Sequence, residues 1–232
     1  MIWQVPQIWE GGDVWILGGG PSVPIQFGIP DKVIQEVMKG NSPPSVYSPY
    51  MSLLHKKHII GINVAYLIGS WIDMVFFGDK GFFLNHQQGL ANFTGLKVSC
   101  HPIADRYDWV KYLAKDTTHG KGISSSPKMV SWNGNSGAAA ISLAVHTGAK
   151  RIILLGFDMQ LNSKNMQHWH NVYNRGERLD KRKLPFERHK RGFPEIAKDA
   201  KRMGVEILNA SPTSEIKEFQ RFSVKELLFD NS

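Results

Sequence analysis

The stretch from Asp13 to Ser22, which reads DVWILGGGPS, decides the fold of this 232-residue chain. Its apolar run, Val14 to Leu17, leads directly into three glycines, Gly18–Gly20, and then into Pro21 and Ser22. A short apolar run that ends in glycine and proline is typical of a buried strand followed by a tight turn. The pattern therefore predicts a core strand whose carboxyl end opens into a glycine-rich loop.

The same alternation continues along the chain. Short continuous apolar runs predict strands at Asp13–Leu17, His58–Ile62, Met74–Phe77, Lys97–Cys100, Arg151–Leu155 and Val205–Leu208. Amphipathic or Ala-rich stretches that each end at a glycine predict helices at Asp31–Lys39, Ser136–Thr147 and Phe193–Met203. Residues 41–50, rich in Pro and Ser, are expected to form a loop, and Ser211–Ser214 to begin a short helix.

Short strands that alternate with capped helices indicate an α/β protein. The expected fold is Rossmann-like, with a mainly parallel sheet and helices on both of its faces. A length of 232 residues suits one domain, and we expect residues 1–232 to form a single one, with a basic lid or loop at 175–191.

The composition indicates a cytoplasmic protein. Cys100 is the only cysteine, which excludes an intramolecular disulfide and a Cys-rich zinc site and favours a reducing compartment. The first residues lack the basic and apolar regions of a signal peptide. The most apolar span, 59–77, is interrupted by Asn63, Gly69 and Asp73, so we expect no membrane segment and read it as strand, short helix and strand.

Positive charge is concentrated between Arg175 and Arg191. Eight Lys or Arg residues stand there against three acidic ones, a local net charge of +5 within a chain of net charge +8. One interpretation is a solvated loop; the other is a lid or arm that contacts a polyanionic acceptor such as DNA. Under the second, Arg182, Lys183 and Arg188 are the expected acceptor contacts. The oligomeric state is not predicted by any of these features.

Small and polar residues follow the predicted strands, where ligands bind in such folds. The loop Gly18-Gly19-Gly20-Pro21-Ser22 lets the backbone approach a phosphate or ribose, although it is neither a dinucleotide fingerprint nor a P-loop. Three other strands end at Asn63, Asp79 and Asp158, which suit hydrogen bonding to a sugar or base. Each of these residues is also a common turn or cap residue.

Two further motifs carry chemistry. Asn135-Ser136-Gly137 opens the Ala-rich helix, whose free N–H groups favour an anion, although a simple N-cap would look the same. His168-Trp169-His170 places two imidazoles within three residues, which suits a general acid or base better than a zinc site, since no further ligands lie nearby.

These motifs together resemble a known superfamily. It contains the bacterial sialyltransferases that use CMP-sialic acid, the archaeal 6-hydroxymethylpterin diphosphokinases and many phage proteins, which the chain resembles most. The pieces that carry the resemblance, in the family's order, are Leu17–Val23, Ile62–Val64, Phe76–Asp79, Asn135–Gly137, Ile153–Asp158 and Asn209–Ser214 followed by Phe219.

The resemblance implies roles for individual residues. The CMP portion of the donor would contact Gly18, Gly20, Pro21, Ser22, Asn63, Ser136 and Gly137, and we add Gly19, Asp79 and Asn135 to this nucleotide-binding set. The family's general base is a His between the Gly-x-Asp strand and the last helix, which points to His168 or His170, with Asp158 beside them as a third catalytic residue. These enzymes need no metal.

Three functional hypotheses follow. The first is a glycosyltransferase that uses a CMP- or UDP-activated sugar and needs no cofactor, with an acceptor such as a glycan or, in a phage-encoded enzyme, the DNA of a bacterial host. The second is a pyrophosphokinase in which Asp79 and Asp158 hold Mg²⁺, since Asp79 stands where the sialyltransferases have Asn. The third is a nucleotide- or nucleic-acid-binding protein without catalysis.

Overall fold

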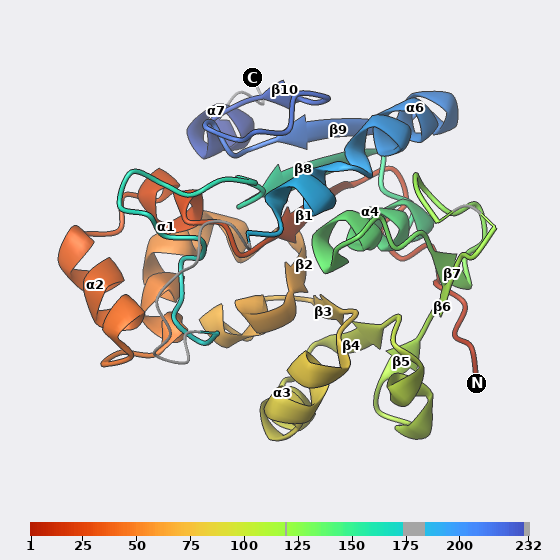
Figure 1. The fold of residues 1–232 in the computed structure, drawn as a ribbon, viewed down its shortest axis with the longest axis horizontal. Helices are drawn as coiled ribbons and strands as arrows, with labels where there is room; N and C mark the ends of the chain where they lie inside the picture. Colours follow the sequence, from red (N-terminus) through yellow and green to blue (C-terminus); the bar gives the residue numbers. More distant parts are fainter. Residues whose placement is uncertain (119, 174–183, 230–232) are drawn as a thin grey trace.

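A computed structural model describes residues 1–118, 120–173 and 184–229, and its centre is one parallel sheet (Figure 1). Eight strands lie in the order β10-β9-β8-β1-β2-β3-β4-β5 within the described residues, and each neighbouring pair is parallel. Their bounds are β1 Asp13–Leu17, β2 His58–Ile62, β3 Met74–Phe77, β4 Leu96–Ser99, β5 Lys111–Tyr112, β8 Arg151–Leu155, β9 Glu206–Asn209 and β10 Gln220–Arg221. Two short strands, β6 (Ala114–Lys115) and β7 (Met129–Val130), pair separately.

Strand β1 lies where the order of the sheet reverses. Trp15 pairs with Ile59 of β2 on one side and with Ile153 of β8 on the other. The chain after β1 builds the sheet in one direction, and the chain after β8 builds it in the other. Such a reversal leaves a crevice beyond the carboxyl ends of the two central strands, where α/β proteins bind ligands.

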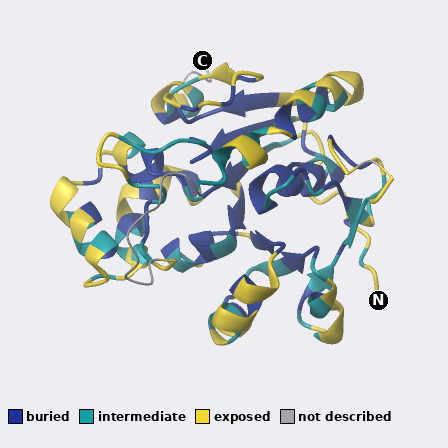
Figure 2. Ribbon diagram, in the orientation of Figure 1, coloured by how far each residue is buried: buried dark blue, intermediate teal, exposed yellow. Residues whose placement is uncertain are grey.

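Helices cover both faces of the sheet, because side chains along each strand point alternately to opposite sides. Val14 and Ile16 pack with α4 (Ser136–His146) and α6 (Phe193–Met203). Trp15 and Leu17 face the second core cluster, which several helical segments cover: α1 Ser22–Gln26, α2 Asp31–Lys39, η1 Pro44–Leu54, η2 Asn63–Ile68, α3 Lys80–Asn92 and α7 Val224–Phe229. Figure 2 shows the central strands buried between these layers. The expected α/β architecture is confirmed.

The predicted elements agree with the structure to within about one residue at most ends, with two errors. The predicted loop at 41–50 is wrong, because the η1 helix begins at Pro44, where the fixed φ of proline suits a first helical position. Ser211–Ser214 is a turn and not a helix start: the Ser214 N–H donates to the Ser211 carbonyl at 3.0 Å. The next helix in the chain, α7, starts only at Val224.

Two short helices complete the described structure: η3 (Pro102–Arg106) and α5 (Phe186–Lys190). None of the helices in the described ranges is both long enough and apolar enough to cross a membrane.

Candidate functional site

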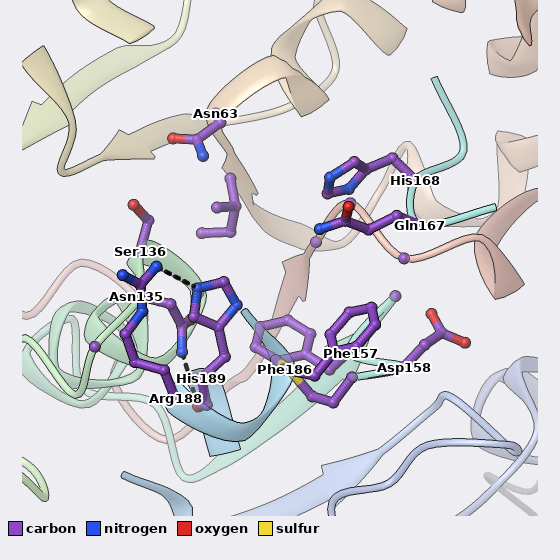
Figure 3. A pocket seen from close by; sticks show the side chains of 18 of the residues that line it. Asn63, Asn135, Ser136, Phe157, Asp158, Gln167, His168, Phe186, Arg188 and His189 are labelled. Carbon is purple, nitrogen blue, oxygen red and sulfur yellow. Dashed lines mark hydrogen bonds between the residues drawn. The ribbon is translucent and has the colours of Figure 1, made fainter. Parts of the chain in front are cut away.

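A cleft of about 200 Å³ lies at the carboxyl ends of β1, β2, β3 and β8, beside the first turn of α4 (Figure 3). It contains most of the residues singled out from the sequence, namely Gly18, Gly19, Gly20, Asn63, Asp79, Asn135, Ser136, Gly137, Asp158, His168 and Arg188. Pro21, Ser22 and His170 do not line it. Trp132, Phe157, Gln160, Phe186 and His189 also line the cleft.

The glycines of the first loop are required by packing within the protein. A Cβ at Gly20 would lie 1.8 Å from Asp158 Oδ2 and 2.5 Å from the Gly156 carbonyl, and one at Gly18 would lie 2.8 Å from that carbonyl. A Cβ at Gly137 would lie 2.9 Å from the Phe157 ring. These positions therefore need glycine so that the loops after β1 and β8 and the start of α4 can approach one another. The space beside these three α-carbons holds protein atoms, where the sequence analysis expected a ligand.

Asp158 anchors the loop after β8. Its side chain is 4% exposed, and Oδ2 accepts hydrogen bonds from the Ser22 hydroxyl at 2.9 Å and from the Ser22 N–H at 3.5 Å. Burial raises the pKa of this carboxyl, and the bonds from Ser22 partly oppose that rise. Asp158 therefore joins two loops of the cleft as well as lining it.

The first turn of α4 presents unpaired donors to the cleft. Asn135 Oδ1 caps the helix by accepting from the Ala138 N–H at 2.8 Å, while the Ser136 and Gly137 N–H groups have no acceptor among the described residues. The Ser136 hydroxyl lies on the same turn, is buried, and has no hydrogen-bond partner in the described structure. Buried polar groups rarely stay unpaired. Two N–H groups and a hydroxyl at the positive end of a helix are donors that suit an anion.

Asn63 presents a second unpaired polar atom. It is the first residue of η2 and has a φ of +51°, a conformation that Asn adopts more readily than most residues. Its Oδ1 is buried without a partner among the described residues, and Asn63 lines the same cleft as Ser136. The unpaired oxygens, Asn63 Oδ1 and Ser136 Oγ, come from the ends of different elements that line one cavity. A polar ligand in the cavity could pair with both atoms.

The structure distinguishes His168 from His170, which the sequence pattern alone could not do. His168 lines the cleft, whereas His170 is 3% exposed and is absent from the lining. Their rings stack at 5.1 Å. Between them Trp169 Nε1 donates to the Gly18 carbonyl at 2.8 Å, which fixes the segment on the glycine-rich loop. Burial lowers the pKa of His168 to about 4 and that of His170 well below its usual value, so both rings are neutral at pH 7.

His189 is a residue of the cleft that the sequence analysis missed. It belongs to α5, within the segment interpreted only as a basic lid, and burial followed by the charge of Arg188 lowers its pKa to about 4. His189 lies between Asp158 and the helix α6, which is the stretch of chain where the resemblance places the general base. This position was the signal that could have identified it. Arg188 Nη2 donates to His189 Nε2 at 3.3 Å.

Helix α5 is held against the start of α4. Asn135 Nδ2 donates to the His189 carbonyl at 3.0 Å, and a Cβ at Gly134 would lie 3.2 Å from the Arg188 carbonyl. Figure 3 shows Asn135, Arg188 and His189 grouped on one side of the cleft. Arg188, predicted as an acceptor contact, thus lies in the cleft; Arg182 and Lys183, predicted with it, lie outside the described residues.

Aromatic side chains form the apolar part of the cleft. Trp132 lines it, with Lys115 Nζ 4.0 Å from the centre of its ring, and Phe157 and Phe186 contribute further apolar surface. Asp79 lines the cleft as the N-cap of α3, although its side chain does not cap that helix. The described ranges contain no cluster of three or more metal-ligating side chains, and Asp79 and Asp158 line one cavity without a third acidic or imidazole ligand grouped with them.

No protein-family model and no curated protein sequence matches the chain. Among solved structures, it is similar to the MAf glycosyltransferase from Magnetospirillum magneticum AMB-1, with a TM-score of 0.58 at 13% identity over 96% of this chain. The match spans only 35% of that longer protein. The sialyltransferase CstII from Campylobacter jejuni, solved with CMP-3FNeuAc, has a TM-score of 0.46 at 13% identity, covering 91% of this chain and 86% of that one. The likeness to the MAf protein shows a shared fold.

Proposed function

We propose that the protein is a glycosyltransferase that uses a nucleotide-activated sugar. One observation carries the proposal: the buried Ser136 hydroxyl has no partner among the described residues and lies beside two unpaired N–H groups at the start of α4. A phosphate group would accept hydrogen bonds from all three donors and would lie at the positive end of the helix. The glycosyltransferase of the same fold supports the choice of reaction class.

The cleft offers complementary surfaces to each part of such a donor. The phosphate of the nucleotide lies on Ser136 and Gly137, with the Arg188 guanidinium on the same side of the cleft. Arginine suits this role because its planar group pairs with phosphate oxygens. Asn63 accepts a hydrogen bond from the ribose or base through its unpaired Oδ1. Trp132 provides a ring face for a planar base or for the apolar side of a sugar.

The reaction is a displacement at the anomeric carbon of the donor sugar. The acceptor oxygen forms the new bond to that carbon as the bond to the phosphate oxygen breaks, and the electron pair leaves with the nucleotide. An imidazole takes the proton of the acceptor hydroxyl. His170 does not line the cleft, and His168 and His189 are the two imidazoles among its described lining residues, so either can take this role. Both rings are neutral at pH 7 and able to accept a proton.

A thermal-shift screen tests the proposal directly. The unmodified protein is heated with CMP, UMP, UDP, GDP, ADP or ATP, each with and without Mg²⁺. A ligand present at about 100 times its Kd adds about 2.7 kcal/mol of stability. We expect at least one nucleoside mono- or diphosphate to raise the melting temperature without Mg²⁺. No stabilisation by any nucleotide would overturn the proposal.

The same screen addresses the two other hypotheses. One observation favours Mg²⁺-dependent pyrophosphate transfer: the Asp79 side chain lines the cleft and does not cap α3. That reaction requires ATP, and its binding should depend on Mg²⁺. Nucleotide binding that is followed by neither sugar transfer nor pyrophosphate transfer would support a binding protein without catalysis.

A further inference from the structure

A second cavity, of about 430 Å³, adjoins the cleft. It lies between α1 and the loops after β8 and β9, and its lining consists of Ser22, Ile25, Gln26, Asp158, Gln160, Leu161, Asn162, Ser163, Pro212 and Thr213. Asp158 and Gln160 are the two described residues that line both cavities. These two side chains therefore form a wall common to both cavities.

The end of the second cavity nearest the cleft is polar and buried. Asp158 is 4% exposed and Ser22 is 8% exposed, and the Ser22 hydroxyl donates to Asp158 Oδ2 at 2.9 Å. Thr213 lines the same cavity, and its side chain lowers the pKa of Asp158 against the larger rise that burial causes. A buried carboxylate held in this way is an acceptor already oriented for a ligand hydroxyl.

Amide side chains hold the walls of this cavity in place. Gln26 Nε2 donates to the Ala210 carbonyl, and Gln26 Oε1 accepts from the Val224 N–H at 3.1 Å. Gln160 Nε2 donates to the Thr213 carbonyl. Asn162 Oδ1 accepts from the Met166 N–H at 2.9 Å. The Gln26 bonds connect α1 to Ala210 and Val224, and the Gln160 bond connects the loop after β8 to the loop after β9. Contacts within the fold therefore hold the walls of the cavity in place.

The charge of the lining restricts the ligand. Among the described residues that line it, Asp158 is the single ionisable side chain, and none is Lys, Arg or His. A phosphate group there would lie beside a buried carboxylate with no cation to offset the two charges, which is strongly unfavourable. The remaining lining includes Ile25, Leu161 and Pro212, which suit an apolar face. The cavity fits a neutral ligand that has hydroxyl groups and an apolar side, as a sugar ring has.

We propose that this second cavity binds the acceptor, and that the acceptor is a neutral glycoside and not a polyanion. The inference rests on the proposed glycosyltransferase function. One acceptor hydroxyl bonds to Asp158, and the reacting hydroxyl extends past Gln160 into the cleft. There its oxygen bonds to the anomeric carbon, its proton passes to an imidazole of the cleft, and the nucleotide leaves with the electron pair.

Saturation-transfer NMR with p-nitrophenyl glycosides of galactose, glucose and N-acetylglucosamine tests the proposal, alongside a 20-nucleotide single strand of DNA. The nucleotide identified by the thermal-shift screen is present throughout. Ile25→Trp fills the cavity from an exposed position, and Thr213→Val removes a hydroxyl at nearly constant volume. Leu84→Trp, on an exposed face of α3, is the matched control.

At least one glycoside should bind to the unmodified protein and to Leu84→Trp. Its Kd should rise about tenfold or more in Ile25→Trp, which fills the cavity, and in Thr213→Val, which removes a polar group from the cavity wall. Nucleotide stabilisation should stay unchanged in all variants, which shows that each is folded. The acceptor assignment would be overturned if no glycoside bound, or if the glycosides bound both cavity variants as tightly as the unmodified protein. It would also be overturned if the DNA strand bound and the glycosides did not. If the unmodified protein bound no nucleotide, the proposed function itself would be overturned.

Discussion

The Ser22 hydroxyl donates a 2.9 Å hydrogen bond to Asp158 Oδ2 across 136 residues of chain. Ser22 begins α1, directly after the glycine-rich loop, and Asp158 follows β8. The bond therefore ties together the ends of β1 and β8, the two strands between which the sheet reverses its order. It also sets the boundary between the cleft and the second cavity, because Asp158 lines both.

Gly20→Ala should destabilise the protein strongly. The added Cβ would lie 1.8 Å from Asp158 Oδ2 and 2.5 Å from the Gly156 carbonyl, so one of the two loops must move. We expect a loss of about 1–3 kcal/mol or more, as for overpacking elsewhere in protein cores, measured by urea unfolding. Gly81→Ala is the control: its Cβ meets nothing within 4 Å, and it lies in α3. Alanine there should add about 0.5–1 kcal/mol. Equal stabilities for the two variants would contradict the packing role of Gly20.

Ser136→Ala should weaken nucleotide binding without lowering stability. The hydroxyl is buried and has no partner in the described structure, so its removal costs the free protein no hydrogen bond. In the complex it would donate to a phosphate, and loss of such a bond costs about 1.5–3 kcal/mol, or roughly ten- to a hundredfold in Kd. Calorimetric titration with the nucleotide from the screen measures this. Ser52→Ala, in η1 and remote from the cleft, should leave Kd unchanged. A Ser136→Ala variant that binds as tightly as the unmodified protein would remove α4 from the site.

One of two single substitutions, His168→Gln or His189→Gln, should lower kcat by about two to four orders of magnitude, the usual contribution of a general base. Nucleotide affinity should change little in the affected variant, because the base acts on the acceptor. His170→Phe should retain turnover, since His170 is buried outside the cleft. Steady-state kinetics of sugar transfer for the three variants identifies the base. Full activity in both Gln variants would contradict an imidazole base.

The stability of the protein should fall as the pH is lowered from about 6.5 to 4. Burial lowers the pKa of His168 and of His189 to about 4, below the usual 6.5 of the unfolded chain. Between these values the unfolded state binds more protons, so stability decreases with decreasing pH, by at most about 1.4 kcal/mol per unit for His168 and by less for the more exposed His189, whose interactions water screens. The stability is fully present above pH 6.5. Urea unfolding at several pH values should show a smaller slope in His168→Gln and in His189→Gln. A slope equal to that of the unmodified protein would contradict the buried, neutral state of these rings.

Much of this protein follows from local patterns in the sequence. The run Val14–Leu17 and the similar runs in β2, β3 and β8 are apolar throughout because both faces of the sheet are covered, so their strands could be predicted from composition alone. Helices that have a proline at their start and a glycine at their end, such as α2 and α6, were predictable for the same local reason. Helix α3 could not be predicted in this way, because Gly81, Gly89 and its polar residues give it no clear helical pattern in the sequence. Its apolar residues pack in one core cluster with those of β3, and that packing stabilises the helix.

The site divides in the same way. That Asn63, Asp79, Asp158 and Ser136 meet at one edge was predictable, because parallel strands end at the same side of the sheet. Long-range contacts decided the rest. They determine that His168 and not His170 lines the cleft, and the bond from Asn135 to α5 holds His189 there. They also require glycine at position 20, because a Cβ there would collide with the Asp158 carboxylate. The sequence alone determined the strands, helix caps and the edge where polar residues collect, since these depend on neighbours in the chain. Only the tertiary structure decided which atoms are paired and which are left open to a ligand, because pairing depends on distances between residues far apart in the chain, 54 positions for Asn135 and His189 and 136 for Ser22 and Asp158.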